Sequence, residues 1–354
     1  MAAPYKRGIG SALLAAGLFG ASTPIAKLLV HGIEPWLLAG LLYLGSGVGL
    51  AILRAIRRLV LADAAPIEYL HGPDRWWLAA AILAGGIVAP VLMMWGLRET
   101  LGSTASLLLN LEGVFTTLIA WFVFRENFDR RIVIGVLAIT AGAVVLSFGS
   151  SFSVAGAVGP LAIVLACLAW AIDNNLTRKV ALNDATQIAM LKGLVAGTVN
   201  VAIAMALGTN LPPLDSAVTA AIVGLLGYGV SLVLFVTALR QLGSARTGAY
   251  FSVAPFVGAV IAVPLLHEPL TLQLICAGAL MALGLWLHLT EDHVHEHVHE
   301  PLEHTHVHTH DEHHVHAHDF AWDGDEPHTH LHRHTAMQHR HAHYPDSHHR
   351  HEHG

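Results

Sequence analysis

Histidine dominates the carboxy-terminal stretch of the chain, and imidazole is the commonest side-chain ligand for metals. Residues 290–354 hold 23 of the 27 histidines, mostly at every second position, as in HVHEHVHE and HTHVHTHDEHHVHAH. In an extended chain, residues i and i+2 lie on one side about 7 Å apart, so modest bending brings two imidazoles to one ion. The pattern predicts a site for a divalent transition metal, Zn, Ni, Co or Cu.

The expected metal ligands recur along three runs, with neighbouring Asp and Glu residues as further ligands. They are His293, His295, His297, His299, His304, His306, His308, His310, His313, His314, His316, His318, His328, His330, His332 and His334. The segment has low hydrophobicity and no helical period, so it is expected to be disordered. A merely solvating or pH-responsive tail is the alternative.

Two carboxylates lie inside apolar stretches. Glu112 stands about ten residues into the stretch 101–124, which puts it about 15 Å deep in a bilayer. A charged group there costs a few kcal/mol unless it is protonated, paired or in water. Glu112 is predicted to bind a cation or carry a proton in a cavity; a neutral Glu bonded to a neighbouring helix is the alternative. Asp173 is interpreted as a cytoplasmic-side gate or coupling site, and Asn174 and Asn175 as a polar cap at the membrane interface.

Small and polar residues recur along the predicted helix of Glu112 at spacings of four, three and four. They are Ser106, Asn110, Gly113 and Thr117. This spacing places them on one helical stripe, which suits a polar cavity wall or close helix packing equally. Glu112 lies two residues from Asn110, about 200° around the helix, so one face cannot hold both centrally.

Three further polar residues within apolar stretches each allow two interpretations. Lys27 and Lys192 are expected to extend toward the lipid headgroups, with substrate contact as the alternative. Asn200 is either a helix-to-helix contact or part of a cavity lining. Three prolines, Pro90, Pro255 and Pro264, interrupt apolar stretches and are predicted hinges.

The elements that must position these residues are apolar segments long enough to cross a membrane. The chain is 54% hydrophobic and 12% charged, with a mean hydropathy of +0.55, which excludes an ordinary soluble enzyme. Apolar stretches of about 20 residues span ~30 Å of hydrocarbon as helices. Ten such stretches predict an all-α membrane protein. They cover residues 8–30, 36–53, 76–97, 101–124, 131–149, 158–177, 186–207, 217–239, 244–266 and 270–289.

The distribution of Lys and Arg residues indicates on which side of the membrane each end of these segments lies. If the chain starts in the cytoplasm, 13 Lys and Arg residues fall on that side and Arg98 alone on the other. Positively charged loops stay inside, so both termini are expected in the cytoplasm, with the protein in the inner (plasma) membrane. A cleaved secretory signal at the amino terminus is the competing interpretation.

The chain also repeats itself. One gap aligns residues 97–142 with 239–284, so that Gly102, Ser103 and Glu126 meet Gly243, Ser244 and Glu268. Five spans are an odd number, so the second half enters from the opposite face and the repeats are inverted. The predicted domains are a first repeat (1–149), a second repeat (150–289) and the histidine-rich tail (290–354).

The segments LFGASTPIAKLLV, the two LGS segments at Gly102 and Gly243, and the RE and HE turns at Glu126 and Glu268 resemble the EamA-type transporters of the drug/metabolite transporter superfamily. The resemblance covers residues 1–289. It implies a secondary transporter of organic metabolites or amino acids, with a cavity lined largely by the third, fourth, eighth and ninth helices.

The leading hypothesis is therefore a gradient-driven transporter of a small organic metabolite or amino acid whose cytoplasmic tail binds divalent metal. A divalent metal exporter that gathers cargo with the tail is one alternative, and a membrane-anchored metal store is another. No phosphate-binding or catalytic motif occurs, so no enzyme activity and no further cofactor are expected. The expected partners are the bilayer, the solute or ion, and the metal. No nucleic acid is expected, and a homodimer is a candidate assembly.

Overall fold

The computed structural model describes residues 2–61, 74–124, 130–147, 154–177, 185–242 and 244–289, and four strands in the tail. The chain divides into two compact units, Met1–Glu291 and Asp292–Gly354. Each unit is described by itself below.

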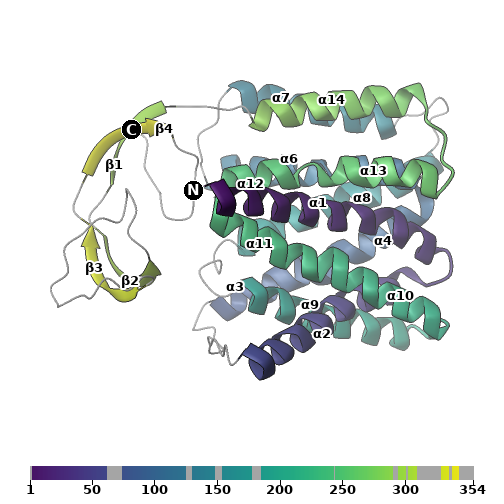
Figure 1. Ribbon diagram of the computed structural model, residues 1–354. Coiled ribbons are helices and arrows are strands. Elements are labelled where there is room, and N and C mark those ends of the chain that lie inside the picture. Colours follow the sequence, from purple (N-terminus) through teal and green to yellow (C-terminus); the bar gives the residue numbers. More distant parts are fainter. Residues whose placement is uncertain are drawn as a thin grey trace. The chain divides into compact units, whose positions relative to one another are not determined.

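The first half of the membrane body contains five spanning segments, two of them interrupted (Figure 1). In order they are α1 (Ala2–Val30); α2 (Pro35–Leu61); α3 (Asp74–Ala81) with η1 (Ile82–Val88) and α4 (Ala89–Glu99); α5 (Gly102–Leu108) with α6 (Leu111–Phe124); and α7 (Arg130–Ser147).

The second half repeats this order. Its segments are α8 (Val154–Thr177); α9 (Ala185–Ala206); α10 (Leu214–Gly224) with η3 (Leu225–Val230) and α11 (Ser231–Leu242); α12 (Ser244–Phe251) with α13 (Ala254–Leu265); and α14 (Leu272–Leu289). Among the described residues, eight segments are long and apolar enough to cross a membrane, and shorter apolar helices stand at Ala254–Leu265 and Leu272–Leu287. The prediction of an all-helical membrane body is confirmed.

The interruptions fall at matching places in the two halves. The third and eighth spans each contain a π-helical segment, η1 and η3. The fourth span breaks at Leu109 and Asn110, and the ninth at Ser252 and Val253. Irregular helix of this kind is tolerated at membrane depth only where protein or water surrounds it. The two broken pairs therefore mark the interior of the bundle.

The predicted hinge prolines lie beside these breaks or near a helix end. Pro90 is the second residue of α4, directly after η1 and Ala89. Pro255 stands in the first turn of α13, where the missing N–H costs nothing. Pro264 lies near the end of α13. Their role as hinges stays a prediction.

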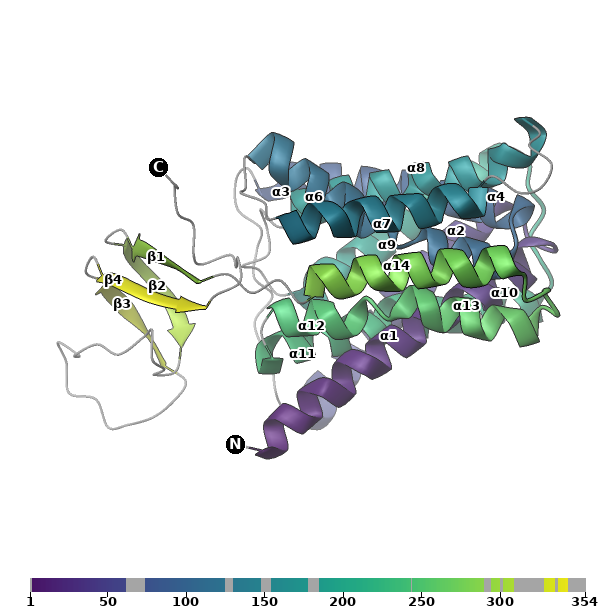
Figure 2. The same ribbon diagram turned by 90° about the horizontal axis from the view of Figure 1, so that it is seen from above.

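The fourth and ninth spans meet at one end of the bundle and separate at the other. Helix α5 packs against α13, whereas α6 packs against α7 and α8, and α12 packs against α1 and α11. Figure 2 shows α6 and α12 on different sides of the bundle, although they overlap in Figure 1. We call the end where they separate the open end, and the end where α5 meets α13 the closed end.

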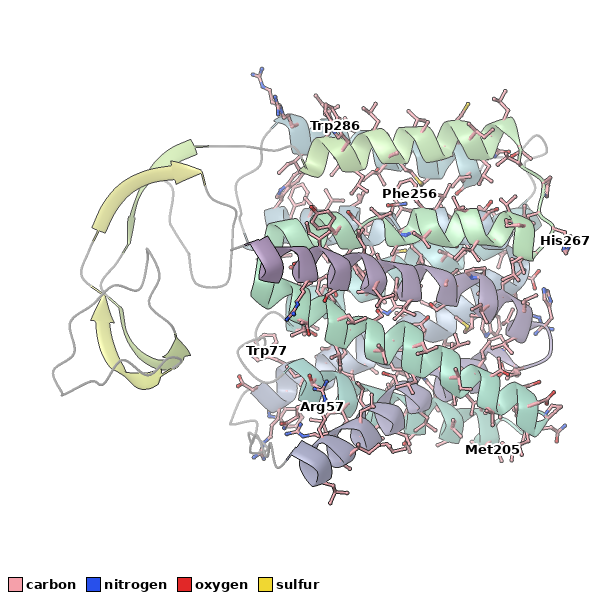
Figure 3. The ribbon with its side chains drawn as sticks, viewed as in Figure 1. Arg57, Trp77, Met205, Phe256, His267 and Trp286 are labelled. Atoms are coloured by element: carbon pink, nitrogen blue, oxygen red, sulfur yellow. The ribbon has the colours of Figure 1, made fainter. Side chains whose placement is uncertain are left out.

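Exposed tryptophans mark the open end as a membrane interface. Figure 3 shows Trp77, Trp286 and Arg57 at this end, and Met205 and His267 at the opposite one. Trp77 is 41% and Trp286 58% exposed. Amphipathic rings and basic groups of this kind gather where hydrocarbon meets the headgroups. The bundle is therefore a multi-pass membrane protein.

Within the tail, the structure describes four short strands in two antiparallel pairs. Strand β1 (Val294–His299) pairs antiparallel with β4 (Met337–Ala342), and β2 (Leu302–His308) with β3 (His328–His334). Low hydrophobicity argued for disorder, but the same runs alternate with period two and contain Thr and Val, which favour strands.

Helices α2 and α9 pack through glycines, which gives a first testable prediction. A Cβ added to Gly193 on α9 would lie 2.6 Å from the Gly47 nitrogen on α2, whereas one added to Gly17 would meet nothing within 4 Å. Gly193→Ala should therefore destabilise the bundle by about 1–3 kcal/mol through overpacking. Gly17→Ala should be neutral or stabilising, because Ala favours helix.

Thermal unfolding of the purified variants in detergent checks this, with a lower midpoint expected for Gly193→Ala only. Equal midpoints for both variants would contradict the close approach of the two helices.

Candidate functional site

An ion pair joins helix α8 to helix α9. Lys192 Nζ lies 2.6 Å from both carboxylate oxygens of Asp173, and the side chains are 17% and 7% exposed. Thr177 Oγ1, one turn along α8, donates to Asp173 Oδ1 at 2.9 Å. The expectation that Lys192 extends to the headgroups is therefore wrong: its ammonium group neutralises Asp173 inside the bundle.

Glu112 lies on the other side of the same turn of α8. Asn174 Nδ2 donates to Glu112 Oε1 at 2.7 Å. Glu112 is half-buried at the start of α6, Asn174 is exposed, and a Cβ at neighbouring Gly113 would find no atom within 4 Å. Adjacent residues of α8 thus present a neutralised carboxylate to α9 and an amide to Glu112. The structure brings Glu112 and Asp173 together, as two residues of one polar cluster.

Asn110 and Ser106 belong elsewhere. Asn110 Nδ2 donates to Leu107 O at 2.9 Å and lies 3.8 Å from Met281 Sδ on α14. Ser106 Oγ donates to Gly102 O at 2.8 Å, one turn back on its own helix. Both side chains are buried. Of the two interpretations of this stripe, these contacts favour helix packing.

The π-helical segment η1 is held by side chains from three helices. Gly85 O accepts hydrogen bonds from Tyr43 Oη at 2.7 Å and Trp170 Nε1 at 3.0 Å. Gly86 O accepts one from Asn200 Nδ2 at 3.0 Å. Asn200 is fully buried, so it is a helix-to-helix contact. Because a Cβ at Gly85 would collide with the Asp173 side chain, glycine is required where η1 passes the polar cluster.

The turn between the third and fourth spans is clamped at the closed end. Glu268 accepts hydrogen bonds from the Gly102 nitrogen at 2.5 Å and the Ser103 nitrogen at 2.8 Å. Lys27 Nζ donates to Leu97 O at 2.6 Å and to Arg98 O at 3.1 Å. Lys27 thus caps the end of α4, and its extension toward the headgroups stays a prediction. Sequence reasoning used Glu268 only as a marker of the repeat and missed its capping role.

Four aromatic rings, which we call the aromatic arc, run across the bundle from α2 to α12. Ring centroids are 5.7 Å apart for Tyr43 and Tyr228, 5.8 Å for Tyr228 and Phe19, and 5.5 Å for Phe19 and Phe251. Phe235 on α11 adds to the far end, 4.8 Å from Phe251. All are half-buried. The rings belong to separate elements, so their spacing in the sequence could not predict that they lie close together.

The structure describes only some of the predicted metal ligands. His293, His310, His313, His314, His316 and His318 lie outside the described residues. The others stand in the strands, where the register sets His304 opposite His332, His306 opposite His330 and His308 opposite His328. Among the side chains that the structure describes, no group of three or more His, Cys, Asp or Glu could hold a metal ion.

Two five-span halves, breaks at matching places and a charged cluster inside the bundle define a membrane transporter built from repeats. The chain belongs to the EamA-like transporter family, which matches residues 6–148 and 157–290, one segment for each half. The resemblance seen in the sequence is thereby confirmed.

Two known proteins similar to the chain are named as a transporter and as a flippase subunit. An uncharacterized transporter of Methanothermobacter thermautotrophicus is 27% identical over 293 residues, which cover 78% of this chain and 84% of the relative. A probable 4-amino-4-deoxy-L-arabinose-phosphoundecaprenol flippase subunit ArnE of Pseudomonas fluorescens is 42% identical over 71 residues, 20% of this chain and 60% of the relative. A crystal structure whose title names no function matches with a TM-score of 0.58 at 19% identity, over 78% of this chain and 95% of its own, and so has the same fold.

The buried ion pair gives a second prediction. Asp173→Asn or Lys192→Met alone leaves one charge unpaired inside the bundle and should destabilise it by about 3–5 kcal/mol. The double variant removes both charges and should be clearly more stable than either single one. Thermal unfolding of the three variants and the wild type, as a double-mutant cycle, measures this coupling. Additive losses in the double variant would mean that the two groups do not neutralise each other.

Proposed function

We propose that this transporter is driven by an ion gradient, moves a small organic solute, and uses Glu112 as its coupling group. The observation that carries the proposal is the hydrogen bond between the half-buried Glu112 and the exposed Asn174, inside two spanning segments. An ionised carboxylate facing hydrocarbon would cost several kcal/mol, which supports a water-facing position for this pair. Asp173, beside it, is already neutralised by Lys192. Glu112 is thus the carboxylate of the cluster available to a proton or a cation.

The arrangement of the broken spans supports alternating access. Glu268, from the second repeat, holds the start of α5 at the closed end, while α6 and α12 separate at the open end. Inverted repeats make the exchange of these two arrangements a natural motion, with the site between them. We assign the open end to the cytoplasm, in the inner membrane, because the expected cytoplasmic loops carry the basic residues.

The tail is proposed to bind divalent transition metal. Cross-strand neighbours have Cβ atoms about 4.5–5.5 Å apart, so the register that sets His304 opposite His332 and His306 opposite His330 suits shared metal ligation. In this function the tail senses or buffers metal beside an organic transporter.

Metal as cargo is the less favoured candidate. Residues 1–289 contain four histidines and two cysteines, few ligands with which to pass a soft ion across the membrane. The match to a flippase subunit named for an amino-sugar lipid, although short, is a further indication of organic cargo. A metal store would have no use for inverted repeats.

A third prediction tests Glu112. In proteoliposomes, a panel of radiolabelled amino acids and amines identifies a transported solute. Glu112→Gln should lose gradient-driven accumulation of that solute at least tenfold, because an amide cannot bind or release a proton. It should keep solute exchange at equal concentrations, which needs no coupling. Asp215→Asn, an exposed acid at the start of α10, is the control and should accumulate solute normally. Normal accumulation by Glu112→Gln would remove Glu112 from the mechanism.

A fourth prediction concerns the tail. Truncation after Thr290 should abolish high-affinity Ni²⁺ or Zn²⁺ binding in calorimetry and leave solute transport unchanged. Binding by the full chain should collapse from pH 7 to pH 5, because imidazoles with a pKa of about 6.5 become protonated and cannot ligate. If metal is the cargo instead, the truncated protein should lose metal export at low metal concentration and retain it at high concentration.

A variant with the same composition tests whether metal binding depends on the cross-strand pairing of the histidines or only on their number. Exchanging Thr329 with His330 and Leu331 with His332 keeps the composition but moves two histidines to the other face of β3. Weaker binding is expected. Unchanged binding would show that the strand register does not organise the ligands.

A further inference from the structure

We infer that a surface groove between the third span and α9 binds one anionic phospholipid, with an acyl chain along the groove and the phosphate at Arg75. The groove has a volume of about 500 Å³ and is lined by residues of α3, η1 and α9. We call it the α3–α9 groove. The inference goes beyond the proposed function and depends neither on Glu112 nor on the cargo.

One wall of the groove is an apolar side of the third span. Leu78 and Ile82 stand four residues apart, as do Leu83 and Ile87, and all four line the groove. This spacing makes two adjacent rows of side chains along one side of the helix. Leu83 is 58% exposed in a segment long and apolar enough to cross a membrane. The wall therefore faces hydrocarbon, and an acyl chain matches it.

The other wall belongs to α9, which packs against η1. Leu191 and Val195, again four residues apart, line the groove, and Val195 is 44% exposed. Lys192, which lies between them in the sequence, contacts Asp173 instead of lining the groove. The groove is thus apolar on both walls although it runs beside the polar cluster.

The groove has about the depth of one leaflet. Its lining residues Arg75 and Ile87 are separated by about 18 Å along a helix that rises 1.5 Å per residue, and half of the hydrocarbon core is about 15 Å. Trp76 and Trp77, which follow Arg75, are 79% and 41% exposed, and Figure 3 shows Trp77 at the open end. Tryptophan gathers at headgroup level. A head at Arg75 would therefore direct its chain along the groove toward the bilayer centre.

The charge at the mouth of the groove favours an anionic head. Arg75 lines the groove and is exposed, and a guanidinium binds phosphate oxygens through two parallel N–H groups. Asp74, in the first turn of α3, does not belong to the lining. The open end is assigned above to the cytoplasm, whose leaflet carries a negative surface potential. Location and charge therefore both favour an anionic phospholipid over a zwitterionic one.

A second groove of similar size provides a matched control. It lies between α7 and α14, has a volume of about 530 Å³, and is lined by Val144, Val145, Leu272, Gln273 and Cys276. None of these described lining residues is charged, and Gln273 donates a hydrogen bond to Val145 O. An acyl chain could enter either groove, but only the α3–α9 groove offers a cationic group to the head. Selection of anionic lipids is therefore expected there and not at the α7–α14 groove.

Native mass spectrometry of the purified full-length chain tests the inference. The probes are dioleoyl-phosphatidylglycerol and dioleoyl-phosphatidylcholine, which share their chains and differ in the charge of the head. The wild type should retain one phosphatidylglycerol about fivefold more tightly than phosphatidylcholine, the preference expected from one basic group at a membrane surface. Arg75→Gln should lose this preference and Arg75→Lys should keep it. Arg57→Gln changes an exposed arginine at the same end, outside the groove lining, and should behave like the wild type.

Two filling variants test the groove itself. Ala79 lines the α3–α9 groove, so Ala79→Trp should exclude the chain and weaken the binding of phosphatidylglycerol. Cys276→Trp fills the α7–α14 groove and should leave this binding unchanged. Thermal midpoints of all variants in detergent show that they are folded. Added phosphatidylglycerol should raise the midpoint of the wild type and of Cys276→Trp, but not that of Ala79→Trp.

Two results would overturn the inference: equal retention of the two lipids by the wild type, or an unchanged preference in Arg75→Gln. Equal competition by glycerol 3-phosphate, which has an anionic head and no chain, would also overturn it, because the site would then bind phosphate alone. Ala79→Trp leaves Arg75 in place, so it decides the question if Arg75→Gln does not fold. These measurements are separate from solute accumulation by Glu112→Gln, so the inference and the proposed function can fail independently.

Discussion

A helix that crosses a membrane must satisfy its backbone polar groups within the protein, because hydrocarbon offers no partners. This bundle interrupts its third, fourth, eighth and ninth spans, so side chains must supply what the regular helix no longer does. At η1 they do so from three directions: Tyr43 and Trp170 bond to Gly85 O, and Asn200 bonds to Gly86 O. Several polar side chains deep in the bundle therefore serve to satisfy the backbone of interrupted helices. Only polar side chains without such a backbone partner are candidates for a role in transport.

The same requirement ties the two repeats together at the closed end. The amide nitrogens that begin α5 have no partners within their own helix, and the carboxylate of Glu268, from the other repeat, accepts from both Gly102 and Ser103. Lys27 does the converse for the carbonyl groups that end α4. Each contact needs charge and orientation together, so the pairing at this end is specific. The repeats share a fold but differ in packing, as a mechanism of alternating access would require.

Length and hydrophobicity alone were sufficient to predict the ten spans, since a membrane-crossing helix has few alternatives. Glu112 and Asp173 could also be found, because a charge inside an apolar run is conspicuous. The partner of Asp173 could not be found: Lys192 lies 19 residues away and resembled a residue that reaches for headgroups. The aromatic arc was hidden for a similar reason, since Phe and Tyr are ordinary in apolar helices and their proximity depends on packing.

Two neighbouring side-chain contacts on α8 differ in strength: the ion pair between Asp173 and Lys192 of α9, and the hydrogen bond between Asn174 and Glu112 of α6. Separating α9 from α8 would break the Asp173–Lys192 pair and leave two unpaired charges, at a cost of about 3–5 kcal/mol. Separating α6 from α8 would break the bond between Glu112 and Asn174, a hydrogen bond to a charged group worth about 1.5–3 kcal/mol, and would break it more cheaply once Glu112 is neutral. The hydrogen bond between α6 and α8 should therefore loosen when Glu112 is neutralised, while the ion pair keeps α8 linked to α9; α6 and α8 also pack against each other. In the mechanism proposed above, the group that binds the ion would itself be a contact between two helices, so coupling would need no distant signal.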